Sequence, residues 1–289
     1  CLLWGSAFPA IKLGYQWFDI SAEATGTQIL FAGYRFTLAG ILTVIIGSIL
    51  AGKVLVPKKK SLKKIAILSI FQTSLHYFCF YVGLAHTTGV KGSIVNAVNV
   101  FFSILVSCII FRLERLNSQK LLGCMIGFAG VVIVNLSGAM DMSFNLLGDG
   151  FLLISAFAYA LSTVLIKIYG KDENPVMLSG YQFFAGGLVM IIIGLIIGGR
   201  ISSVTVQGIL LLLYMGFISA GAYTLWGILL KYNPVSRIAV FGFFTPIFGV
   251  ILSALILKEG TSFDGKTLAA LILVCIGTVI VNYEKSVKG

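Results

Sequence analysis

The sequence predicts an all-α integral membrane protein with ten transmembrane helices, built as two inverted repeats of five helices each. Of the 289 residues, 58% are hydrophobic and only 11% are charged, whereas soluble domains average about 25% charged residues. The apolar runs are long enough to cross a bilayer. In addition, one 21-residue stretch recurs in the second half of the chain.

The apolar runs read as helices because lipid leaves only helices and closed barrels able to pair every backbone group. Barrel strands alternate apolar and polar side chains over about 10 residues. These runs instead stay apolar over about 16 to 24 residues. Ten spans follow, at 1–18, 29–51, 65–85, 92–111, 121–136, 146–169, 177–198, 209–230, 238–257 and 267–283.

The repeat pairs Gly33–Lys53 with Gly180–Arg200, 147 positions later, and 9 of the 21 positions are identical. Val90–Glu114 aligns with Val235–Glu259 at an offset of 145, and Lys12 can be set against Lys167, with Trp4 against Tyr159. The sequence therefore divides into a first repeat at 1–137 and a second at 146–284. Five helices is an odd number, so the second repeat enters the membrane the other way up, which is typical of secondary transporters.

The distribution of lysine and arginine predicts the orientation. With a cytoplasmic N-terminus, fifteen of these residues fall in inside loops and four in outside loops. This positive-inside bias predicts a multi-pass protein of the plasma (inner) membrane with both termini in the cytoplasm. The chain starts at Cys1 within an apolar run, so we expect further residues before it and no cleaved signal peptide.

Composition argues against several other classes of protein. The net charge of +11 comes from basic residues at the ends of spans, so we expect no nucleic-acid partner. The five cysteines lie in apolar runs without a CxxC pair, so neither a metal site nor a cofactor is predicted. The partners that remain are the lipid bilayer and a small-molecule substrate, and a homodimer is left open.

Several short motifs occur in a fixed order along the chain. They are WGSAFPAIKLG at Trp4–Gly14, the glutamates Glu114 and Glu259, and GVVIVN and GTVIVN ending the fifth and tenth spans. In this order they resemble the EamA type of the drug/metabolite transporter superfamily, over essentially the whole chain. The resemblance implies export or exchange of small metabolites, often amino acids. It also implies a central cavity among helices one to four and six to nine.

Charged residues inside spans are the first site candidates. All ten acidic residues fall in loops or at span ends, so proton coupling would need His76 or a span-end glutamate. Lys12 and Arg35 lie within spans, with no carboxylate at comparable depth. They either hold an anionic group of a substrate in a wet cavity or extend to the outer interface.

Helix four carries a polar stripe on one face, at Ser93, Asn96, Asn99, Ser103 and Ser107. It is either a cavity wall or a helix-packing face. Its counterparts in helix nine are apolar, and include Phe241 and Phe244. This asymmetry predicts an amphiphilic substrate.

Helix three adds Gln72 and His76, one turn apart, and helix eight adds Tyr223 and Trp226. A packing histidine and an interfacial tryptophan are the alternative interpretations. The complete predicted substrate-binding set is Lys12, Tyr34, Arg35, Gln72, His76, Asn96, Asn99, Tyr223, Trp226, Phe241 and Phe244.

Taken together, the residues predict a secondary transporter that exports or exchanges small amphiphilic metabolites, amino acids included, by alternating access. The alternatives are an exporter of larger or cationic drug-like compounds, and a channel. A membrane enzyme is least favoured, because the sequence has no HExxH motif, no paired intramembrane carboxylates and no Ser/His/Asp set.

Overall fold

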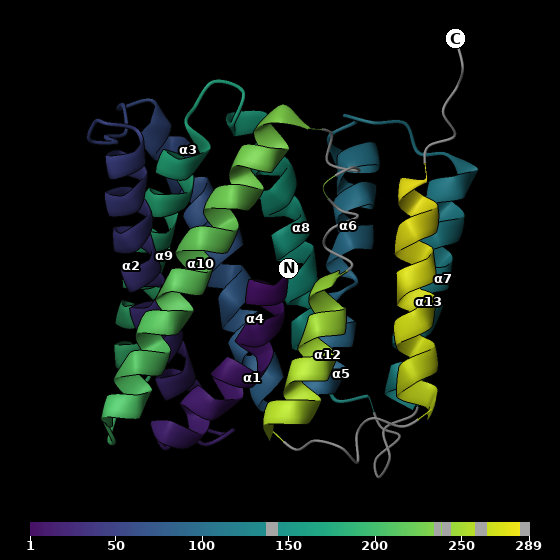
Figure 1. The fold of residues 1–289 in the computed structure, drawn as a ribbon, viewed down its shortest axis with the longest axis horizontal. Helices are drawn as coiled ribbons and strands as arrows, with labels where there is room; N and C mark the ends of the chain where they lie inside the picture. Colours follow the sequence, from purple (N-terminus) through teal and green to yellow (C-terminus); the bar gives the residue numbers. More distant parts are fainter. Residues whose placement is uncertain (137–143, 234–237, 239–243, 258–264, 284–289) are drawn as a thin grey trace.

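The computed structural model describes residues 1–136, 144–233, 238, 244–257 and 265–283, and these ranges contain helices and turns but no strand. The first part of the chain forms α1 (Leu2–Trp17), α2 (Thr25–Leu50), α3 (Ser61–Leu68), η1 (Ser69–Leu75), α4 (His76–Ala85), α5 (Gly89–Asn96), α6 (Asn99–Leu105), η2 (Val106–Ile110) and α7 (Ser118–Leu136). The second part forms η3 (Leu146–Gly150), α8 (Phe151–Tyr169), α9 (Pro175–Ile196), α10 (Val206–Tyr232), α12 (Phe244–Leu257) and α13 (Gly265–Asn282). The helices stand roughly side by side in one slab (Figure 1).

The structure confirms an all-α integral membrane protein. Among the described residues, six helical segments are long and apolar enough to cross a bilayer: Thr25–Leu50, Ser61–Ala85, Lys91–Ile110, Leu146–Tyr169, Pro175–Ile196 and Val206–Tyr232. The helices α1, α7, α12 and α13 overlap the other four predicted spans. The count of ten transmembrane helices remains a prediction, because part of the span at 238–257 lies outside the described residues.

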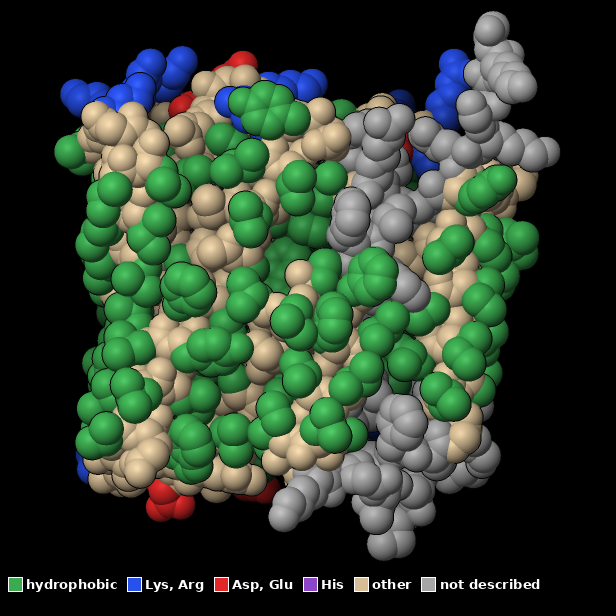
Figure 2. Space-filling model, viewed as in Figure 1, with side chains coloured by type: hydrophobic (Ala, Val, Ile, Leu, Met, Phe, Trp, Pro, Cys, Tyr) green, Lys and Arg blue, Asp and Glu red, His purple; other side chains and the backbone are tan. Residues whose placement is uncertain are grey.

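The surface has the banding of a membrane protein. Apolar side chains cover most of the visible face, and lysine and arginine gather along its upper edge (Figure 2). This edge, which we call the basic end, includes the exposed side chains of Lys53, Lys58, Lys59 and Lys60 in the loop between α2 and α3, and of Lys63 at the start of α3. On the opposite end, Asp19 and Glu23 are exposed in the α1–α2 connection.

The repeated stretch forms the contact between α2 and α9. These helices cross so closely that a methyl group on Gly40 would lie 2.4 Å from the backbone nitrogen of Phe184. A methyl group on Gly187 would lie 2.4 Å from the backbone nitrogen of Thr37. Gly40 and Gly187 are 147 positions apart, and so are Thr37 and Phe184, so the contact is unchanged when the two repeats are exchanged.

The helices α7 and α13 form a second close pair, at the right of Figure 1. A methyl group on Gly123 would lie 2.5 Å from the carbonyl oxygen of Gly277, and the reverse distance is also 2.5 Å. Small residues allow this approach of two backbones in lipid. The pair stands at the edge of the bundle, so the centre is left to α1, α4, α8 and α10.

A buried carboxylate ties α3 to the α8–α9 connection at the basic end. Glu173 is 6% exposed, and it accepts hydrogen bonds from Ser61 Oγ at 2.9 Å and Lys64 Nζ at 3.0 Å. Burial alone would raise the pKa of Glu173, but the two hydrogen bonds outweigh it and hold the pKa below its ordinary value of 4.5. Its contribution to stability is therefore present above pH 4.5 and is lost as the pH falls through the lower folded-state pKa.

We expect Glu173→Gln to lower the melting temperature of the detergent-solubilised protein by a few degrees at pH 7. The difference from wild type should shrink as the pH is lowered below 4.5, because the wild-type carboxylate is then protonated as well. Thermal unfolding measured across pH 3 to 7 checks this. Asp172→Asn is the matched control, since Asp172 is 76% exposed and 4.0 Å from the same Lys64 Nζ. A difference that did not change with pH would contradict the assignment.

Candidate functional site

A cavity of about 80 Å³ lies at the centre of the bundle. Its walls come from α1, α4, α8 and α10, from α5 and α6, and from single residues of α2 and α12. Ligand pockets typically have about 300 to 1,000 Å³. The cavity as it stands is therefore contracted, and a metabolite would need its walls to move apart.

Arg35 is the only arginine or lysine among the described residues that line this cavity. Its side chain is 2% exposed, and it bridges two central helices. Nη1 donates to the Tyr81 hydroxyl at 2.8 Å, Nη2 donates to Ser219 Oγ at 3.1 Å, and Nε donates to the Met215 carbonyl at 3.3 Å. These acceptors are neutral, and none of the described lining residues is acidic. The guanidinium charge therefore has no counter-ion in the described wall of the cavity.

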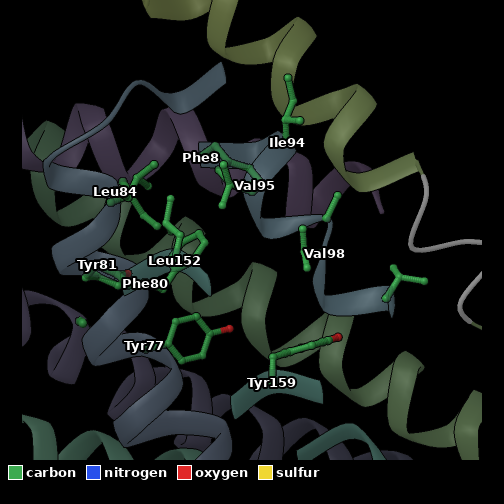
Figure 3. Packing of buried hydrophobic residues seen from close by; sticks show 14 of the residues in the cluster. Phe8, Tyr77, Phe80, Tyr81, Leu84, Ile94, Val95, Val98, Leu152 and Tyr159 are labelled. Carbon is green, nitrogen blue, oxygen red and sulfur yellow. The ribbon is translucent and has the colours of Figure 1, made fainter. Parts of the chain in front are cut away.

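Aromatic rings form a second wall of the cavity. Trp4 lies at the centre of this group, with ring centroids 5.0 Å from Trp226, 5.1 Å from Tyr223 and 6.5 Å from Tyr159. The hydroxyls of Tyr77 and Tyr223 are 2.5 Å apart. In Figure 3, Tyr77 and Tyr159 lie at the lower edge of the apolar cluster that contains Phe8, Val95 and Leu152.

Five buried polar atoms of lining residues have no hydrogen-bond partner within the described part of the chain. They are Trp4 Nε1, Asn96 Oδ1, Thr163 Oγ1, Trp226 Nε1 and Thr245 Oγ1. A buried polar group without a partner costs about 1–3 kcal/mol. Their gathering around one cavity indicates that a polar ligand or water satisfies them.

His76 presents an acceptor to the cavity. Its Nδ1 lies 2.9 Å from the carbonyl oxygen of Ser155 and 2.8 Å from Ser155 Oγ. A carbonyl only accepts, so Nδ1 carries the proton. In the neutral ring Nε2 is then an acceptor, and the side chain lines the cavity. A substrate with a donor group could use it.

Six of the predicted site residues line the cavity: Arg35, His76, Asn96, Asn99, Tyr223 and Trp226. The polar stripe of helix four contributes Ser93 and Ser103 as well, whereas Ser107 is buried outside the lining. The stripe therefore forms one wall of the cavity along most of its length.

Four further predicted residues do not line the cavity. Tyr34 and Phe244 are 40% and 42% exposed on the surface of the bundle. Gln72 is buried in η1, and Lys12 donates a hydrogen bond to the carbonyl of Thr87. Phe241 lies outside the described residues. Tyr34 points away because a neighbour in a helix is rotated by about 100° from Arg35.

Sequence reasoning did not select Trp4, Tyr77, Phe80, Tyr159, Thr163 and Thr245, which also line the cavity. The repeat sets Trp4 against Tyr159, and the two rings pack edge to face, with centroids 6.5 Å apart. Matching aromatic residues in corresponding helices of two repeats were a usable signal. Thr163 lies one turn after Tyr159 on the same face of α8.

These features define a polytopic membrane protein with a central cavity that is lined by aromatic and polar side chains and, among the described lining residues, by one buried cation. The chain belongs to the EamA-like transporter family, whose sequence pattern matches residues 1–136 and 146–283. The expected resemblance to this family is thereby confirmed, and the protein is a membrane transporter by family.

Similar proteins include an uncharacterized transporter of Archaeoglobus fulgidus, which is 27% identical over 96% of this chain and 94% of its own. The uncharacterized transporter YvbV of Bacillus subtilis is 24% identical, over 98% of this chain and 92% of its own. A solved crystal structure superposes with a TM-score of 0.66 at 18% identity, covering 95% of this chain and 94% of that one, which shows a shared fold.

Proposed function

We propose that the chain is a secondary transporter that exports or exchanges small amphiphilic carboxylates, amino acids included. The observation that carries this proposal is Arg35, a fully buried cation with three neutral partners and no carboxylate among the described lining residues. A buried charge of this kind is strongly stabilised by an anion, and a guanidinium fits a carboxylate in a bidentate way.

The two walls support an amphiphilic substrate. The rings of Trp4, Tyr223 and Trp226 offer apolar faces, while Asn96 Oδ1 and His76 Nε2 can accept hydrogen bonds from an amino or hydroxyl group. Cationic compounds are less well supported, because the cation Arg35 would repel them and no acidic lining residue is described. Larger compounds would need the walls of the cavity of about 80 Å³ to move further apart.

Corresponding helices of the two repeats make corresponding contacts, which supports inverted repeats and alternating access. The helix α1 packs against α10 and α12, and correspondingly α8 packs against α4 and α6. The first helix of each repeat thus contacts helices of the other repeat, so we propose that the moving units cross the boundary between the repeats. The basic end would face the cytoplasm of a plasma (inner) membrane, following the positive-inside rule.

His76 is our candidate for any proton coupling. Within the described residues it is the one titratable imidazole that lines the cavity. The acidic side chains of the described residues lie at the ends of the bundle. Uniport or exchange without a coupling ion is the simpler mechanism for this set of residues.

Counterflow in proteoliposomes tests the proposal. Vesicles are loaded with a mixture of amino acids, other carboxylates and organic cations, with or without a pH gradient, and exchange is followed by mass spectrometry. We expect selective movement of one class of carboxylate. Movement of cations alone would contradict the assignment of Arg35, and movement only under a pH gradient would bring His76 into the transport step.

A further inference from the structure

Two lysines, Lys12 and Lys167, each connect two of the helices around the central cavity, at opposite ends of the bundle. Among the four central helices, α1 packs against α10 and α4 packs against α8. A lysine side chain reaches from α1 to the end of α4, and another reaches from α8 to the end of α10. We call the boundary between α1 and α4 the first seam and the boundary between α8 and α10 the second seam. Because α3 starts next to the basic end, the continuous segment through η1 and α4 ends at the opposite end. The helix α10 runs the other way and ends near α8 at the top of Figure 1.

Lys12 holds the first seam. This α1 side chain donates to the carbonyl of Thr87, two residues beyond the last residue of α4. Three residues along α1, the Tyr15 hydroxyl donates to the carbonyl of Tyr81 at 2.8 Å, across the same seam. Both contacts lie between the cavity and the end opposite the basic end.

Lys167 holds the second seam. This side chain lies in the last turn of α8, and its Nζ donates to the carbonyls of Leu230 at 3.0 Å and Asn233 at 2.7 Å. These carbonyls terminate α10 at the basic end. The carbonyls at a helix C-terminus lack partners within the helix and carry its negative partial charge, so a lysine there is favourable.

The two contacts are equivalent under the repeat. The sequence alignment sets Lys12 against Lys167. The residue that caps α4 is His86 and the residue that caps α10 is Asn233. These caps are 147 positions apart, the same offset that relates α2 to α9. Lys167 reaches the cap residue Asn233 itself, whereas Lys12 reaches Thr87, one residue beyond the cap residue His86. A lysine of the first helix of each repeat thus contacts the end of a corresponding helix, once at each end of the bundle.

We propose that Lys12 and Lys167 are paired positioning residues, each locking the cavity at one membrane face. This inference rests on the proposed alternating access, because a seam that opens to one side must release its lysine while the other remains bound. With both lysines bound, the cavity has only about 80 Å³. This structure therefore shows a small cavity with both lysine contacts made.

The test measures which side of the membrane reaches the cavity. Ala97, a lining residue, is replaced by cysteine in a chain whose five native cysteines are changed to serine. A membrane-impermeant maleimide is then applied to sealed vesicles of either orientation. We expect Lys12→Met to raise labelling several-fold from the side opposite the basic end, and Lys167→Met to raise it from the basic end.

Lys53→Met is the matched control, since Lys53 is exposed at the basic end away from both seams. Lys12→Arg and Lys167→Arg should restore the wild-type pattern, because arginine also donates to carbonyls. Labelling that rose from the same side in both lysine variants, or did not change, would overturn the proposal. Since labelling needs no substrate, absence of carboxylate transport together with opposite shifts would overturn only the substrate assignment.

Discussion

Replacing Arg35 by glutamine is expected to reduce exchange of carboxylate substrates by about 30-fold or more. Loss of a desolvated charge-assisted pair costs about 2–5 kcal/mol, and 1.4 kcal/mol corresponds to a factor of ten. The guanidinium also bridges Tyr81 of α4 and Ser219 of α10, so its removal loosens the contact between two cavity walls. Counterflow of the substrate class found for wild type measures the effect.

Controls separate binding from folding in this experiment. Arg35→Lys keeps the charge but loses the planar fork, so we expect intermediate activity and a weaker apparent affinity. Arg200→Gln removes an arginine that is exposed at the end of the bundle, so its exchange should match wild type. Size-exclusion profiles and melting curves show whether each variant is folded. A folded Arg35→Gln protein with normal exchange would refute the role of Arg35.

The sequence identified the polar wall of the cavity because lipid makes such patterns costly. A stripe of serines and asparagines must face protein or water, and Asn96 and Asn99 do line the cavity. Arg35 was predictable for the same reason, since no carboxylate lies at its depth. The repeat further paired Trp4 with Tyr159, although only the structure shows them on one wall.

Other residues could not be placed from the sequence, because a residue in the cavity wall and a residue packed between helices can have the same sequence pattern. Lys12 is a cation in a span, but it binds the carbonyl of Thr87 in the α4–α5 connection and does not line the cavity. Gln72 is polar and buried, but it lies in a π-helical segment beside the cavity. For an apolar residue such as Phe244, the sequence does not show whether the side chain faces lipid or a bound ligand. The sequence could predict the order of the helices, but not which helix ends the side chains of Lys12 and Lys167 contact.

Gly40→Ala is expected to lower the melting temperature by about 2–12 °C. The added methyl group would lie 2.4 Å from the backbone nitrogen of Phe184 and 2.7 Å from both its Cα and the carbonyl oxygen of Gly180. Backbone atoms cannot rotate away as side chains do, so α2 and α9 must separate. Overpacking costs about 1–3 kcal/mol, and a change of 1 kcal/mol shifts the melting temperature by about 2–4 °C in chains of 150–250 residues.

Gly221→Ala is the matched control, because it makes the same substitution in α10, where a methyl group would meet no atom within 4 Å. Alanine favours helix over glycine by about 1 kcal/mol, so the melting temperature should stay the same or rise. Gly187→Ala should resemble Gly40→Ala, since its methyl group would lie 2.4 Å from the Thr37 nitrogen. Equal behaviour of Gly40 and Gly221 variants would contradict close packing of α2 on α9. A large loss in the Gly40 variant but not the Gly187 variant would contradict the equivalence of the two repeats at this contact.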